Sequence, residues 1–244
     1  MARLSPQPVR VDSPPMAAVT IDLQTTSLRE LNRYLHADAA DAGIQRVYVL
    51  NPDGAHAIAC GLTFPVDVEV EGHAGYYVAG MNKHAHVTVR GNAGPGAAEN
   101  MMSGVVRICG FASTSAAASA RGGTLIIEGD ASLRCAISLK GADVIVGGRV
   151  GDFSAFMAQA GRLLICGDAG EGLGDSLYEA VIYIRGEVRS LGADAQFEPM
   201  QESDFEAVAG LLQLAGFDHE PQEFRRIASA RRLYHWNADA NQTY

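Results

Sequence analysis

Glycine recurs along this chain at a fixed interval of 19 residues. The seven positions that share the interval are Gly72, Gly91, Gly110, Gly129, Gly148, Gly167 and Gly186. A period of this length, kept without a gap, is typical of a solenoid, in which each repeat forms one turn of the chain and stacks on the turn before it. No other feature of the sequence limits the possible folds as strongly.

The residues around each repeat glycine recur as well. An aliphatic residue stands four and two positions before every repeat glycine, as Val68 and Val70 do in the first repeat. A small residue stands seven positions after it, Ala in six repeats and Gly174 in the other. Alternating aliphatic residues closed by glycine predict a short strand with one buried face and a corner after it.

A strand of about five residues cannot bury its face alone, so the strands of successive turns must lie side by side, about 4.8 Å apart. The fold class that we predict is therefore mainly β: a right-handed parallel β-helix (solenoid) of seven 19-residue turns over residues 66–199. The small residues seven positions after the glycines then form a second inner wall, where the backbones approach closely.

Two other periodic folds fit the sequence less well. A left-handed hexapeptide β-helix needs an aliphatic residue at every sixth position, but residues six after Val70 and its equivalents include Tyr76 and Asp152. A calcium-binding solenoid needs a continuous column of aspartates. Only Asp175 and Asp194 stand at equivalent positions on adjacent turns.

Three further segments flank the repeat. Residues 1–15 contain Pro14 and Pro15 and lack the apolar core of a signal peptide, so we expect a disordered leader. Residues 16–65 have the pattern of a small α/β cap for the first turn. Its expected elements are a strand over Val19–Leu23, a helix from the capping box Ser27–Glu30 to about Asp41, and short strands over 46–50 and 56–60.

Residues 200–244 are predicted to form a C-terminal helical docking tail. The capping box Ser203–Glu206 opens one helix that ends at Gly216, and a second helix is expected from Gln222 to about Tyr234. The second helix would carry Arg225, Arg226, Arg231 and Arg232. On an acidic chain these arginines indicate either a partner-docking surface or a solvated helix face, and the sequence leaves both open.

Charge and cysteine content narrow the functional classes. The chain has 19 Lys and Arg against 28 Asp and Glu, a net charge of −9, which disfavours electrostatic binding of nucleic acid. No apolar run approaches the roughly 18 residues that a membrane-spanning helix needs. The 4 cysteines show no close pairing, which is typical of a reducing compartment, and we expect a cytoplasmic protein.

Motifs that carry chemistry are scarce. The segment Gly167–Gly174 resembles a dinucleotide-binding loop, but no helix pattern follows it, and the repeat explains its glycines. His84 and His86 have strand spacing for two metal ligands without a third ligand nearby. Cys109 and Cys166 are predicted to lie three turns apart, about 14 Å, too far for a disulfide or a shared metal.

From the residues alone we therefore assign no catalytic, cofactor-binding or metal site, and we assign the repeat glycines a structural role. Four methionines lie in the variable half of the turns, either as interface residues or as fillers of the second inner wall. They are Met81, Met101, Met102 and Met157.

Several unbroken runs resemble a known family. They are Gly91–Gly96, Glu99–Gly104, Ser154–Gly161 and Gly167–Asp175, with the flanking runs Asn51–Ile58 and Ser229–His235. Together they resemble the Gly-rich (GXGXG) β-helix domain at the C-terminal end of the glutamate synthase large subunit. The similarity is closer to the stand-alone β-helix subunit of N-methylglutamate synthase and its glutamate-synthase-like relatives, over nearly the whole chain after residue 16.

The resemblance implies a non-catalytic scaffold subunit of a hetero-oligomeric transferase in methylamine and glutamate nitrogen metabolism. Its implied partners are an amidotransferase-like subunit and a flavin-binding subunit that carries FMN and an iron–sulfur cluster. The family assigns no catalytic residue to the β-helix, and none is carried over here. A scaffold of the formylmethanofuran dehydrogenase C type and a free-standing carbohydrate-active β-helix enzyme are the alternatives.

Overall fold

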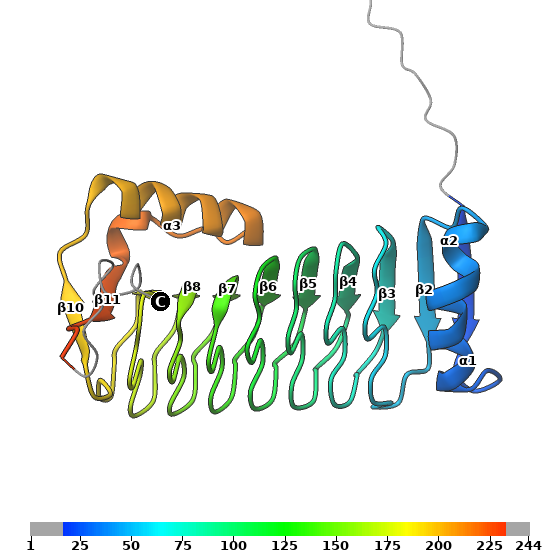
Figure 1. The fold of residues 1–244 in the computed structure, drawn as a ribbon, viewed down its shortest axis with the longest axis horizontal. Coiled ribbons are helices and arrows are strands. Elements are labelled where there is room, and N and C mark those ends of the chain that lie inside the picture. The colour runs from blue at the N-terminus through cyan, green and yellow to red at the C-terminus, as the bar shows by residue number, and fades with distance from the viewer. Residues whose placement is uncertain (1–16, 233–244) are drawn as a thin grey trace, which may run out of the picture.

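The computed structural model describes residues 17–232 and shows an elongated parallel β-solenoid (Figure 1). One 11-stranded sheet runs along its whole length in the order β1–β2–β3–β4–β5–β6–β7–β8–β9–β11–β10. The strands of the repeat are β3 (Asp67–Glu71), β4 (His86–Val89), β5 (Val105–Ile108), β6 (Thr124–Ile127), β7 (Lys140–Val146), β8 (Ala160–Ile165) and β9 (Val181–Ile184). Each pairs with the next in parallel and in the register that the 19-residue period predicts, as Val70 with Val89. The exception is the start of the β7–β8 pair, where Lys140 lies opposite Ala160 before the register shifts.

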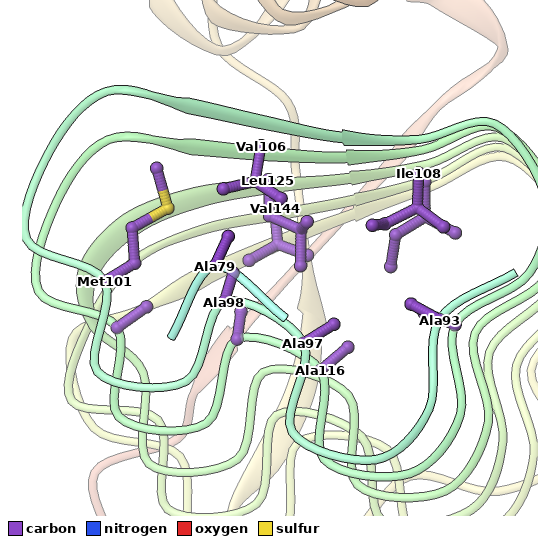
Figure 2. Close-up of a cluster of buried hydrophobic side chains, with 14 of the residues drawn as sticks. Ala79, Ala93, Ala97, Ala98, Met101, Val106, Ile108, Ala116, Leu125 and Val144 are labelled. Atoms are coloured by element: carbon purple, nitrogen blue, oxygen red, sulfur yellow. The ribbon is translucent and has the colours of Figure 1, made fainter. Parts of the chain in front are cut away.

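The core lies where the sequence places it. Both aliphatic columns of the strands are buried, with Val70, Ile108 and Val146 fully inaccessible. The facing wall consists of alanines, such as Ala79 and Ala98, which are also fully buried. Figure 2 shows the aliphatic side chains pointing from the strands toward these alanines. The two predicted inner walls are therefore confirmed.

The repeat glycines lie at the corners after the strands, but for a reason that the sequence does not show. Apart from Gly72, none of them has the left-handed backbone that favours glycine. A Cβ atom on Gly129 would lie 2.8 Å from the carbonyl oxygen of Gly110 on the previous turn. The Gly129 amide also donates a 3.0 Å hydrogen bond to that oxygen. Backbone lies directly on backbone here, and any side chain would separate the turns.

A second recurring feature was not predicted. In each of the first six repeats, the residues five, seven and nine positions after the glycine have positive φ, as Tyr77, Ala79 and Met81 do. Their amides bond alternately to the two neighbouring turns: Tyr77 to the carbonyl of Pro95 on the next turn, and Ala79 to that of Ile58 on the previous one. The left-handed conformation is imposed by these inter-turn bonds, because alanine has no preference for it.

The N-terminal segment joins the same sheet. Strands β1 (Ala18–Asp22) and β2 (Arg46–Leu50) pair in parallel with each other, and β2 pairs with β3. Between them lie α1 (Leu28–Arg33), a π-helical turn (Tyr34–Asp38) and α2 (Ala39–Asp41). The Ser27–Glu30 capping box is present as expected.

The strand predicted over 56–60 is wrong. Ala57 and Ala59 have φ values of 57° and 56°, the alternating pattern of the later turns. The Ala57 amide donates to the carbonyl of Tyr76 at 2.6 Å. The segment is therefore held as a solenoid corner by the turn that follows it.

The C-terminal segment differs from the prediction in two ways. Helix α3 (Glu202–Ala215) ends at Gly216 as expected, but its N-cap is Gln201, because the Asp204 carboxylate accepts the Gln201 amide hydrogen at 2.9 Å. The second helix is wrong: a single 3-10 turn (Pro221–Glu223) leads into strand β11 (Arg225–Ser229).

Strand β11 inserts antiparallel between β9 and β10 (Ala195–Glu198). It pairs with the edge of β9 that the end of the repeat would leave open, and its Ile227 is fully buried. The part of the predicted helix after residue 232, like the leader over residues 1–15, lies outside the described residues.

Helix α3 lies along the outer face of the sheet (Figure 1). Beneath it a second core joins Ile126, Ile145, Leu164 and Tyr183 of the sheet to Val208, Leu211, Leu212 and Ala215 of α3. The equivalent outward position is polar on the earlier strands, where it holds Glu69, Thr88 and Arg107. This change from polar to apolar along one outward column is the sequence signal that predicts a covering helix.

Candidate functional site

The residue directly after each repeat glycine forms a ladder on the outside of the corner. On four turns its side chain accepts the backbone N–H of the equivalent residue on the next turn. The acceptors are His73 Nδ1 for Asn92 (2.9 Å), Asn92 Oδ1 for Phe111 (3.0 Å), Asp130 Oδ1 for Arg149 (3.0 Å) and Asp168 Oδ1 for Glu187 (2.8 Å). These bonds give the backbone N–H groups at the corner an acceptor. Regular strand pairing has ended there, and only isolated β-bridges join the turns.

A groove of about 860 Å³ runs beside this ladder across the third to sixth repeats. Its lining alternates between small residues that face the core and larger residues that face solvent, because the chain is extended there. The lining residues are Phe111, Ala112, Gly129, Asp130, Ala131, Ser132, Arg149, Val150, Gly151, Asp152, Asp168, Ala169 and Gly170. We call this surface the corner groove.

The corner groove is acidic. Asp130, Asp152 and Asp168 face a single cation, Arg149, within its lining. Arg149 contacts Asp130 with Nε 3.1 Å from Oδ2, and three quarters of the Arg149 side chain is exposed. The Asp152 carboxylate accepts the Glu171 amide hydrogen at 2.7 Å. All three carboxylates therefore bond to backbone as well as adding negative charge.

The two histidines with strand spacing, His84 and His86, have different neighbours. His86 Nδ1 lies 3.6 Å from Asp67, whereas His84 lies 3.4 Å from the hydroxyl of Ser103. Within residues 17–232 no three His, Cys, Asp or Glu side chains come together as metal ligands.

The cysteines are held as neutral thiols. Burial raises the pKa of Cys135 to about 12 and that of Cys166 to about 11. The pKa values of Cys60 and Cys109 are also raised, chiefly by burial. A nucleophilic or metal-binding cysteine needs the thiolate, and these environments disfavour it.

Three of the four C-terminal arginines, Arg225, Arg226 and Arg231, contact other side chains of this same chain. Arg226 pairs with Glu198 and Asp204, and Arg231 Nη2 lies 3.1 Å from Glu179. Arg225 lies over the Phe197 ring, 5.1 Å from its centroid. The Arg232 side chain is exposed.

Arg226 and Arg231 also line a polar hollow of about 320 Å³ at the C-terminal end. Much of the positive charge at this end is therefore balanced within the fold. Docking through these arginines stays a prediction.

The methionines divide between the core and the surface. Met101 is fully buried and fills the end of the core between the strands and the alanine wall (Figure 2). Met81, Met102 and Met157 are 52%, 48% and 37% exposed. Half-exposed Tyr76, Tyr77, Leu133 and Phe153 add to this apolar surface on the turns.

The features that define this protein are a parallel β-solenoid with a glycine-stacked corner, an outer helix and an acidic corner groove. No family model matches the chain. A solved structure with the same fold is a chain of the formyltransferase/hydrolase complex (FhcABCD) from Methylorubrum extorquens, solved with methylofuran. The TM-score is 0.61 at 20% identity, over 85% of this chain and 87% of that one.

The class of protein is thus a β-solenoid whose fold also occurs in a multi-subunit enzyme. A curated relative, Protein GlxC of Rhizobium meliloti (strain 1021), is 52% identical over 225 residues, which cover 92% of this chain and 99% of the relative. The chain belongs to the GlxC family. No helix within residues 17–232 is long and apolar enough to cross a membrane.

Proposed function

We propose that this chain is a non-catalytic scaffold subunit of a glutamate-synthase-like flavoenzyme in the cytoplasm, of the N-methylglutamate synthase type. In this proposal it bridges an amidotransferase-like subunit and a subunit that carries FMN and an iron–sulfur cluster. The observation that carries the proposal is the solenoid itself, together with the sequence runs that resemble the Gly-rich β-helix of glutamate synthases.

The physical properties of the solenoid suit this role. Backbone hydrogen bonds join each turn to both neighbours at the strands, at the glycine corner and at the left-handed corner. A rod held in this way keeps two partners on different faces at a fixed separation. A reactive nitrogen intermediate that passes between two active sites requires such a fixed separation.

The surface chemistry also supports a scaffold. The carboxylates of the corner groove accept backbone N–H groups of the next turn, which is a structural use. The cysteine environments disfavour thiolates, so we assign the iron–sulfur cluster to a partner. The resemblance implies that the same partner holds the flavin.

The second candidate is a scaffold in a formyltransferase/hydrolase-type assembly. The observation that favours it is the structural similarity to a chain of the FhcABCD complex. The two candidates differ in colour, because a flavin and an iron–sulfur cluster absorb visible light. A free-standing carbohydrate-active enzyme is the third candidate, and it predicts turnover of a polysaccharide by the isolated chain.

The test is affinity purification of the tagged chain from its native cells, followed by a visible spectrum and mass spectrometry. We expect a yellow-brown preparation with flavin absorbance and two additional chains, one of them amidotransferase-like. A colourless complex with formyltransferase-like chains would replace the first candidate by the second. Glycan turnover by the chain alone would contradict both.

A further inference from the structure

We propose that the corner groove binds an extended, lysine- or arginine-bearing segment of a partner subunit. This inference rests on the proposed scaffold function and adds to it the surface and the charge of one contact. The groove is concave, crosses four successive repeats and has an acidic lining. Half-exposed Phe111 lies at one end, where it can contact the aliphatic stem of a basic side chain.

The negative charge of the groove is not required by the backbone ladder. Asn92 occupies the same position as Asp130 two turns earlier, and its side-chain oxygen accepts the next amide at the same 3.0 Å. His73 does the same with a ring nitrogen. A neutral acceptor therefore suffices at this position, and the carboxylates of Asp130 and Asp168 add a charge that the ladder does not use. Asp152 lies outside the ladder, four positions after Gly148, and adds a third negative charge to the lining.

The charge favours a polypeptide cation over the other occupants. The three aspartates are not gathered closely enough to form a metal site. A second copy of this chain also has a net charge of −9 and would be repelled overall. A basic segment laid along the groove can meet the carboxylates of successive turns, which are about 4.8 Å apart per turn.

The chain offers a charge-matched pair of variants. The groove variant is Asp130→Asn, Asp152→Asn and Asp168→Asn, which keeps an oxygen acceptor at each site. The control variant is Glu206→Gln, Asp218→Asn and Glu220→Gln, three exposed positions within α3 or shortly after it. Both variants lose three negative charges, so any difference in binding reports the location of the charge. Unchanged melting temperatures will show that both fold.

The first measurement needs no partner: fluorescence anisotropy of a labelled hexa-arginine peptide titrated with each isolated chain. We expect about tenfold weaker binding for the groove variant and less than about twofold for the control, with the difference shrinking at high salt. Equally weakened peptide binding in both variants would overturn the inference. That result would not bear on the proposed scaffold function, because the measurement contains no partner subunit.

The second measurement is carbodiimide cross-linking of the native assembly, which joins carboxylates to lysines in direct contact. We expect cross-links from Asp130, Asp152 or Asp168 to a partner's lysines, and at least about tenfold less of that partner with the groove variant than with the control. Cross-links from the groove to Lys83 or Lys140 of a second copy would overturn the inference. So would a partner retained equally by both variants. If no partner is present at all, the scaffold proposal fails separately.

Discussion

Arg107 on β5 donates a 2.9 Å hydrogen bond to the carbonyl oxygen of Ala215, the last residue of α3. The two residues are 108 positions apart in the chain. Arg107 is also the last polar residue of the outward column before it becomes apolar at Ile126. The helix thus ends where the apolar surface beneath it ends, and a cation there interacts favourably with the helix C-terminus.

Replacing Arg107 by alanine should loosen the end of α3. We expect a loss of about 1 kcal/mol in the free energy of unfolding and faster amide exchange in the last turn of α3 than in its first. Arg90→Ala removes an arginine directly after the previous strand, β4, that pairs with Glu69, and it should leave exchange in α3 unchanged. Equal exchange in both variants would show that Arg107 does not anchor the helix.

The glycine corner can be tested with two substitutions of opposite expected sign. Gly129→Ala places a Cβ atom 2.8 Å from the backbone of the previous turn and should destabilise by about 1–3 kcal/mol. Gly210→Ala lies within α3, where a Cβ would meet nothing within 4 Å, and should stabilise by about 0.5–1 kcal/mol. Chemical denaturation measures both, and a harmless Gly129→Ala would contradict the stacking account.

The inward and outward assignment of the strands is tested by Val146→Asp. Val146 is fully buried in the inner column, so an unpaired carboxylate there should cost more than about 3 kcal/mol. Leu133→Asp, at a side chain that is 46% exposed, is the control and should change stability by less than about 1 kcal/mol. Similar melting temperatures for the two variants would mean that the assignment is wrong.

Buried thiols give the fold a dependence on alkaline pH. The folded pKa values of Cys135 and Cys166, about 12 and about 11, exceed the usual value of 9.0 because of burial. Their contribution to stability is therefore complete below pH 9.0 and is lost as the pH rises through the folded values, because the unfolded chain releases these protons first.

We expect the urea midpoint to fall between about pH 8 and about pH 10.5, and to fall less in the Cys135→Ala, Cys166→Ala double variant. The comparison within each protein removes the constant cost of the lost sulfur atoms. The same slope in both proteins would show that other groups cause the pH dependence.

The period of 19 residues was sufficient to predict the architecture, because the hydrophobic columns and the glycines both follow it. It did not reveal why Gly129 must be glycine, since close stacking depends on the neighbouring turn rather than on local conformation. The left-handed residues Ala79 and Ala98 were also missed, because their conformation follows from hydrogen bonds to other turns.

Around Ile227 the local sequence favours a helix, because Pro221 and the arginines that follow it fit a first helical turn. An open strand edge at β9 outweighed that local preference. The acidity of the corner groove has a signal in the sequence. In the column of residues that directly follow the repeat glycines, Asp130 and Asp168 stand at the positions equivalent to Asn92. The depth of the groove could not be predicted, because it depends on how the side chains of four successive turns are arranged in space.

Native mass spectrometry of the assembly purified from its own cells through a tag on this chain tests the central claim most directly. The account predicts a complex that contains this 25.8 kDa chain together with two other kinds of chain, and that releases flavin when denatured. A particle whose mass is a simple multiple of this chain alone would contradict the scaffold role.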